Sequence, residues 1–102
     1  MAKGYWIARV DVRDPAQYQH YVNANAEAFA TYGARFLVRS GPFEAVEGSH
    51  RPRNVVIEFA SLAQALACWN SAEYQRARAL RLDVAEADVV IVEGYDGPQP
   101  GQ

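Results

Sequence analysis

The stretch GYWIARVDVRDP, residues 4–15, decides how the chain begins to fold. Residues 5–12 alternate between two faces, which is typical of a β-strand. A helix is expected to follow at once, because Asp14 is a good N-cap and Pro15 at the first helical position misses no hydrogen bond. The first predicted unit is therefore a strand that runs directly into a helix.

The same two periodicities recur outward along the chain. Helical spacing continues from Pro15 to Tyr32, where Gly33 favours a stop, and returns over 62–82. Asn70-Ser71 offers a second cap, so the later helix is expected to break there and restart at Ala72. Three further strands are predicted over 34–40, 54–59 and 88–94, with a short extension of the first over 43–47.

This order of elements is βαββαβ, which predicts an α+β, ferredoxin-like two-layer sandwich. We expect a four-stranded antiparallel sheet in the order 4-1-3-2, with both helices on one face. Residues 1–95 are expected to form this single domain. Residues 96–102 are rich in Gly and Pro and are expected to be a flexible or partner-touching tail.

Helices cover only one face of such a sheet, so the second face is informative. The residues expected to face the helices are Trp6, Ala8, Val10, Phe36, Val38, Val55, Ile57, Phe59, Val90 and Val92. The opposite set mixes aliphatic and charged residues: Tyr5, Ile7, Arg9, Arg35, Leu37, Arg39, Asn54, Val56, Glu58, Val89, Ile91 and Glu93. A mixed face of this kind suits a protein interface and predicts a homodimer. The alternative is a monomer whose sheet is partly hydrated.

Composition excludes several classes of function. Of 102 residues, 50% are hydrophobic and the net charge is −2, which indicates a packed domain without the basic surface that binds nucleic acid. The one cysteine, Cys68, lies in a helical pattern and is expected to be a small buried residue, so no Cys-based metal site is predicted. No leader or apolar run of membrane-spanning length is apparent, which predicts a cytoplasmic protein without membrane partners.

Several short motifs together resemble one family. They are Gly4-Tyr5-Trp6-Ile7-Ala8, Val10-Asp11-Val12, Asp14-Pro15, Tyr18 with Tyr21, Gly33-Ala34-Arg35-Phe36, Arg39 before Gly41, Glu47-Gly48, Asn54-Val55-Val56-Ile57-Glu58-Phe59, Ser71 with Glu73-Tyr74, and Glu93-Gly94-Tyr95. Across nearly the whole chain this combination is similar to the domain-of-unknown-function 1330 family. Trp69-Asn70 departs from the pattern, where Tyr or Phe and a polar residue are expected.

The resemblance implies the dimeric α+β barrel superfamily, in which two ferredoxin-like sheets close face to face. Relatives there include cofactor-free monooxygenases of polyketide quinols, muconolactone isomerase and haem enzymes. The family itself comes with no established reaction. The resemblance therefore sharpens the expected fold more than the expected function.

The first group of candidate site residues is charged. Arg39, Glu58 and Arg9 are all expected on the uncovered, barrel side of the sheet, where they either hold a ligand or form an ion pair at the dimer interface. His50 lies in a polar hairpin loop, at the mouth of a possible pocket. His20 is expected on a helix surface, where solvent is its ordinary environment. Two histidines without further ligands predict no metal site.

The second group lies between the helices and the sheet. Asn25 is the odd polar residue in an apolar helix stripe, and a buried amide must be hydrogen-bonded to protein or to a ligand. Trp6, Trp69 and Tyr74 either line a ligand cavity with it or simply pack. If the two groups separate, we expect the site on the barrel side, because a buried ionised pair is easier to rationalise beside polar ligand atoms.

Three classes of function follow, and no cofactor is expected in any of them. The first is a monooxygenase-like or isomerase-like enzyme acting on a small hydrophobic or aromatic molecule. The second is a binding module that does no chemistry, and the third is a structural or regulatory dimer. A cavity of roughly 300 Å³ or more favours the first two.

Overall fold

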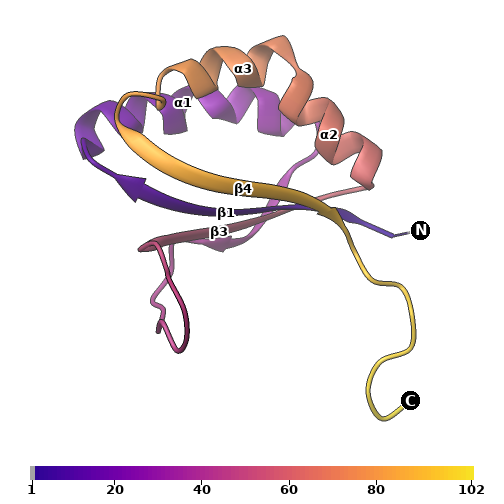
Figure 1. The fold of residues 1–102 in the computed structure, drawn as a ribbon. Coiled ribbons are helices and arrows are strands. Elements are labelled where there is room, and N and C mark those ends of the chain that lie inside the picture. Colours follow the sequence, from indigo (N-terminus) through magenta and orange to yellow (C-terminus); the bar gives the residue numbers. More distant parts are fainter. Residues whose placement is uncertain (1) are drawn as a thin grey trace.

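The chain folds into two layers, with three helices lying across one face of a four-stranded sheet (Figure 1). The computed structural model describes residues 2–102, so residue 1 of the predicted domain lies outside it. The elements in chain order are β1 (Gly4–Val12), α1 (Pro15–Thr31), β2 (Arg35–Arg39), β3 (Arg53–Phe59), α2 (Leu62–Asn70), α3 (Ala72–Ala79) and β4 (Ala85–Glu93).

The sheet is antiparallel with the strand order β2-β3-β1-β4, as predicted. The fold is ferredoxin-like, and the prediction that the helices share one face is confirmed (Figure 1). The loop between β2 and β3 and the C-terminal tail both hang on the other side of the sheet. We call this uncovered side the open face.

The predicted helix caps form. The Asp14 carboxylate accepts a hydrogen bond from the backbone N–H of Gln17 at 3.2 Å, which starts α1. Ser71 ends α2 and caps α3, accepting from the backbone N–H of Tyr74 at 3.1 Å. The expected break in the second helix is therefore confirmed.

Two boundaries differ from the sequence prediction. Residues 43–47 form no strand, because the loop that contains them is exposed and pairs with no neighbouring strand. β4 begins at Ala85 rather than at Asp88, because Val12 at the end of β1 pairs with Ala85 and extends the ladder. Small alanines in this segment hide the strand from a pattern search.

The predicted faces of β4 were inverted. Trp6 pairs with Ile91 and Ile7 with Val90, so the helices cover Val89 and Ile91 while Val90 and Val92 lie on the open face. Val90 is 58% exposed. The run from 89 to 92 is apolar on both faces, so its own alternation carries no information, and pairing with β1 decides the register.

The predicted faces of β2 were wrong for Val38 and Arg39. Phe36 pairs with Ile57, but Val38 pairs with Val56, because the register shifts between them. One extra residue in β2 is the signature of a β-bulge. Val38 therefore lies on the open face, and Arg39, which pairs with Val55, turns towards the helices.

Aromatic side chains fill the space between the layers. The Trp6 ring makes edge-to-face contacts with Phe29, Trp69 and Tyr74, with ring centres 4.9–5.5 Å apart. Its indole N–H donates to the carbonyl of Ala65 at 2.9 Å. This cluster ties β1 to all three helices and forms one wall of the candidate site.

Candidate functional site

A cavity lies between the sheet and helices α1 and α3. The cavity volume is about 40 Å³. All the space between the lining atoms, including the part that opens to solvent, amounts to about 490 Å³. The smaller of these volumes holds several waters, and a larger ligand requires side chains at the mouth to move. The lining residues are Trp6, Ala8, Val10, Tyr18, Tyr21, Val22, Asn25, Phe29, Phe36, Arg39, Arg53, Val55, Ile57, Tyr74, Arg81, Ala87 and Val89.

Three polar side chains are hydrogen-bonded to one another in the cavity wall. The hydroxyls of Tyr21 and Tyr74 lie 2.9 Å apart, and the Arg81 Nη2 donates to the Tyr74 hydroxyl at 3.3 Å. All three residues are buried, although they come from α1, α3 and the turn after α3. We call them the tyrosine–arginine cluster.

Burial governs the protonation of these groups. It raises the pKa of the Tyr21 hydroxyl well above its usual range, and the neighbouring Tyr74 adds to the rise. Burial likewise raises the pKa of Tyr18, and the nearby Arg53 offsets part of that effect. Both phenols are therefore neutral at physiological pH and act as hydrogen-bonding groups rather than as bases.

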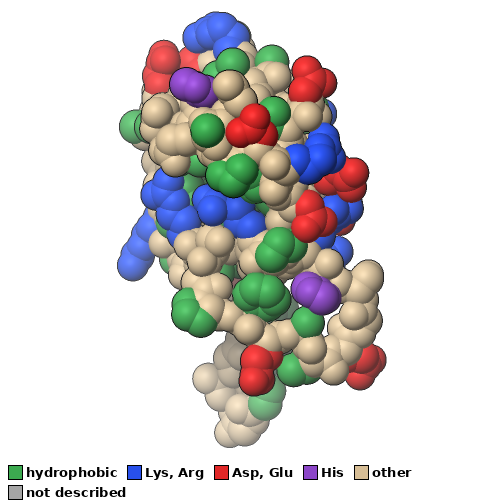
Figure 2. Space-filling view, turned by 90° about the vertical axis from the view of Figure 1, so that its left-hand side faces the viewer, with side chains coloured by type: hydrophobic (Ala, Val, Ile, Leu, Met, Phe, Trp, Pro, Cys, Tyr) green, Lys and Arg blue, Asp and Glu red, His purple; other side chains and the backbone are tan. Residues whose placement is uncertain are grey.

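Two more arginines lie against aromatic rings of the cavity. The Arg39 guanidinium lies 4.1 Å from the centre of the Phe36 ring, and that of Arg53 lies 5.3 Å from the Tyr18 ring. Lys and Arg side chains gather across the middle of one end of the molecule, with apolar side chains among them (Figure 2).

The residues predicted from the helix stripes meet in this cavity. Trp6, Asn25 and Tyr74 all line it and are all buried, with Asn25 only 5% exposed. Trp69 does not line it but packs against both Trp6 and Tyr74 from behind. Arg39, which was expected on the other side of the sheet, joins the lining.

The remaining predicted residues lie on the open face. Glu58 accepts a hydrogen bond from the Tyr5 hydroxyl at 3.0 Å, and Arg9 donates to the Ser49 carbonyl at 3.4 Å. The expected Arg39–Glu58 pair does not form, because the bulge places the two on opposite faces. The sheet therefore separates Glu58 and Arg9 from the predicted residues that line the helix-side cavity.

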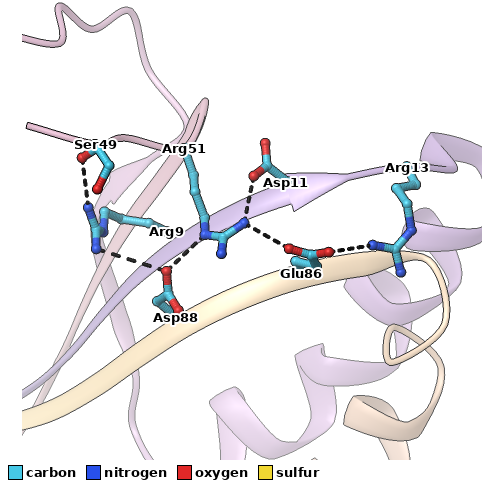
Figure 3. Close-up of polar contacts among 7 residues, drawn as sticks. All are labelled: Arg9, Asp11, Arg13, Ser49, Arg51, Glu86 and Asp88. Carbon is cyan, nitrogen blue, oxygen red and sulfur yellow. Dashed lines mark hydrogen bonds and ion pairs between the residues drawn. The ribbon is translucent and has the colours of Figure 1, made fainter.

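His50 lies on the same open side, in a hollow of about 250 Å³ with Arg9, Asp11, Ser49, Arg51 and Asp88. Arg51 holds this region together, donating to Asp11 at 2.6 Å, to Asp88 at 2.8 Å and to Glu86 at 3.4 Å (Figure 3). Hydrogen bonding from Arg51 lowers the pKa of the Asp88 carboxyl. The network pins the β2–β3 loop to the strands β1 and β4. His20 is exposed on α1.

Two cationic residues of the cavity, Arg53 and Arg81, were not predicted as site residues from the sequence. Arg53 has the same parity as Val55 and Ile57, so extending the alternation of β3 backward by one step would have placed it towards the helices. Arg81 follows Tyr74 and Ala77 at helical spacing, so the helix predicted over 62–82 places it on the same buried face as Tyr74.

Within residues 2–102, no three His, Cys, Asp or Glu side chains are grouped so that they could hold a metal ion. In the same residues, no helix has the length and apolar character needed to cross a membrane. The cavity walls contain arginine, tyrosine and asparagine as polar groups, which can hold polar ligand atoms by hydrogen bonds.

Comparison with known proteins connects this geometry to a family. A model described as "Domain of unknown function (DUF1330)" matches residues 3–95. No curated protein matches the sequence. A protein of unknown function from Rhodopseudomonas palustris shares the fold with a TM-score of 0.75, 14% identity, and coverage of 94% of this chain and 85% of that one.

Two further structures are similar at the level of the fold. SnoaB, a cofactor-independent oxygenase from Streptomyces nogalater, has a TM-score of 0.62 at 10% identity over 100% of both chains. A dimeric ferredoxin-like protein of unknown function from Thermobifida fusca has a TM-score of 0.59 at 17% identity, covering 90% of this chain and 89% of that one.

Proposed function

The chain belongs to the family described as Domain of unknown function (DUF1330), and from that premise we propose that it binds a small aromatic or otherwise apolar molecule between its helices and its sheet. The composition of the cavity lining carries the proposal, because the space itself, about 40 Å³, is below the roughly 300 Å³ of an open ligand site and side chains must move to admit a ligand. The walls of the cavity are mainly aromatic and aliphatic, with a few polar groups that converge on one region. Ligand sites in proteins have this composition.

A binding assay with a filled-cavity variant tests the proposal. Ala8 lines the cavity, so Ala8→Leu places extra carbon atoms inside it, whereas Ala26→Leu adds the same atoms on the exposed side of α1. We expect native mass spectrometry to find a co-purified small molecule on the protein from its own host. Ala8→Leu should lose that molecule, and Ala26→Leu should keep it. Retention by Ala8→Leu would place the site elsewhere.

A second candidate is cofactor-free oxygenation or isomerisation of the bound molecule. The tyrosine–arginine cluster favours it, because preorganised donors stabilise negative charge that develops on a substrate during reaction. SnoaB, whose fold is similar to that of this chain, is a cofactor-independent oxygenase. Oxygen uptake with enolisable aromatic compounds measures it, and binding without uptake or isomerisation leaves a binding module.

We also propose that the open face pairs with a second copy of the chain. Ile7, Leu37, Val38, Val90 and Val92 are each at least 40% exposed there, and apolar patches of this kind commonly mark interfaces. The acidic and basic side chains beside them can set the orientation of two copies. The Thermobifida fusca protein of similar fold is dimeric.

Sedimentation tests this pairing. Val90→Asp places a charge on the open face, whereas Leu66→Asp places one on the exposed side of α2. The first change should convert dimer to monomer, because a charge buried without a partner is costly. The second should leave the dimer intact. A wild-type monomer at high micromolar concentration would refute the pairing.

A further inference from the structure

Three arginines from three separate segments line the same cavity. Arg39 comes from β2, Arg53 from β3 and Arg81 from the turn after α3. The lining contains no Asp, Glu or His, and within residues 2–102 none of the three arginines forms an ion pair. Three positive charges, from the buried Arg81, the half-buried Arg53 and the exposed Arg39, therefore line one cavity without a counter-charge from the protein.

Arg81 is the most unusual of the three. It is 6% exposed, its guanidinium donates a hydrogen bond to the Tyr74 hydroxyl at 3.3 Å, and the guanidinium lies 5.4 Å from the centre of the Tyr21 ring. A buried charge is costly unless it is paired or fully hydrogen-bonded. By contrast, Arg51 on the open face is paired in the ordinary way and contacts three carboxylates.

Arg53 and Arg39 are the other two arginines of the cavity, and neither is paired with a carboxylate in the part of the chain that the structure describes. The Arg53 Nε is buried and has no hydrogen-bond partner. The bulge in β2 turns Arg39 to the helix side, where its strand neighbour β3 also presents Arg53. Without the bulge, Arg39 would lie on the open face opposite Asn54, and the cavity would lose one of its cations. Guanidinium groups stacked on rings keep their in-plane N–H donors free for an anion.

Resting on the proposed function, we infer that the natural ligand is an organic acid whose carboxylate binds Arg81, Arg53 and Arg39 while its apolar body packs against Trp6 and Phe29. Guanidinium and carboxylate are both planar and pair through two parallel hydrogen bonds. A carboxylate fits better than a phosphate, because no glycine lines the cavity to supply a cradle of backbone amides. The first-turn residues that line it, Tyr18 of α1 and Tyr74 of α3, already donate their backbone N–H groups to the Asp14 carbonyl and the Ser71 hydroxyl.

Calorimetry with two probes of one shape tests this assignment. trans-Cinnamate carries a carboxylate, and trans-cinnamamide replaces it with a neutral amide. The wild-type protein at pH 7 should bind cinnamate at least about tenfold more tightly than the amide, because charge-assisted hydrogen bonds are the stronger ones. Phenyl phosphate forms a third arm, and tighter binding of it than of cinnamate would overturn the choice of carboxylate.

Variants separate a ligand role from a structural one. Arg81→Met should lower cinnamate affinity at least about tenfold and leave cinnamamide affinity unchanged. Its melting temperature should hold or rise, because the change removes a buried charge that no carboxylate neutralises. Arg76→Gln, on the exposed side of α3, is the matched control and should change neither. Should Arg81→Met fail to fold, the exposed Arg39→Gln gives the same selective loss for cinnamate.

The remaining outcomes separate a failure of the anionic-ligand inference from a failure of the proposed function on which it rests. Equal binding of the acid and the amide, with Arg81→Met and Arg39→Gln without effect, would overturn the anionic ligand and leave an apolar site standing. Absence of binding by both probes at millimolar concentration, together with no co-purified molecule, would overturn the proposed function and this inference with it.

Discussion

Replacing Tyr74 with phenylalanine is the sharpest test of the tyrosine–arginine cluster. The Tyr74 hydroxyl lies 2.9 Å from that of Tyr21 and accepts from Arg81 at 3.3 Å, in a side chain that is 1% exposed. Its removal leaves two buried polar groups without these partners. Each unsatisfied group costs about 1–3 kcal/mol, so Tyr74→Phe should lose about 2–6 kcal/mol of unfolding free energy.

Urea unfolding measures the loss, with an unchanged m-value as evidence that the transition stays two-state. A double-mutant cycle with Tyr21→Phe isolates the hydroxyl–hydroxyl term, since the two groups contact each other directly. Tyr5→Phe is the matched control, because its hydroxyl bonds to Glu58 on the open face, where water can replace the lost partner. The control should lose less than Tyr74→Phe.

A Tyr74→Phe variant as stable as the wild type, within about 0.5 kcal/mol, would refute the reasoning. The hydroxyl would then make no net contribution, and Arg81 would have another partner in solution. Arg81 would then not need a ligand carboxylate to complete its hydrogen bonding.

Three further predictions concern separate parts of the fold. Gly4→Ala should destabilise the protein by about 1–3 kcal/mol in urea unfolding, because the new Cβ would come within 2.3 Å of the Ser61 carbonyl oxygen; unchanged stability would contradict this packing. Cys68 should resist thiol reagents until urea unfolds the chain, since burial raises its pKa to about 12; rapid native labelling would be the contrary result. Arg51 lowers the folded-state pKa of Asp88. The stability advantage of wild type over Asp88→Asn should therefore be complete above about pH 3.8 and lost as the pH falls below it. Melting curves at pH 7 and pH 3 measure this, and a constant difference would contradict it.

Local patterns predicted the helices and strands well where a pattern was compatible with only one structure. β1 was predicted at its observed bounds, because its alternation ends at a strong helix cap, Asp14-Pro15. The break between α2 and α3 was predicted from Ser71, whose hydroxyl caps the second helix. Trp6, Asn25 and Tyr74 were placed between the layers because strand parity and helix spacing both reach that space.

The faces of β4 and the end of β2 could not be read in the same way. Both faces of residues 89–92 are apolar, so either register buries a valine or isoleucine and only the pairing with β1 decides. A bulge needs just one extra residue, and nothing in the residues around Leu37 marks it. The bulge explains why Arg39 was expected on the open face rather than in the cavity that it lines.

The sequence by itself determined the order of elements, the sheet topology and the aromatic layer, because these depend on periodicities carried by neighbouring residues. Only the tertiary structure decided the candidate site. Its cations come from positions 39, 53 and 81, which a strand bulge, the far end of a hairpin and the turn after a helix bring to one cavity. Such a meeting depends on register and packing between distant segments, and no local pattern encodes it.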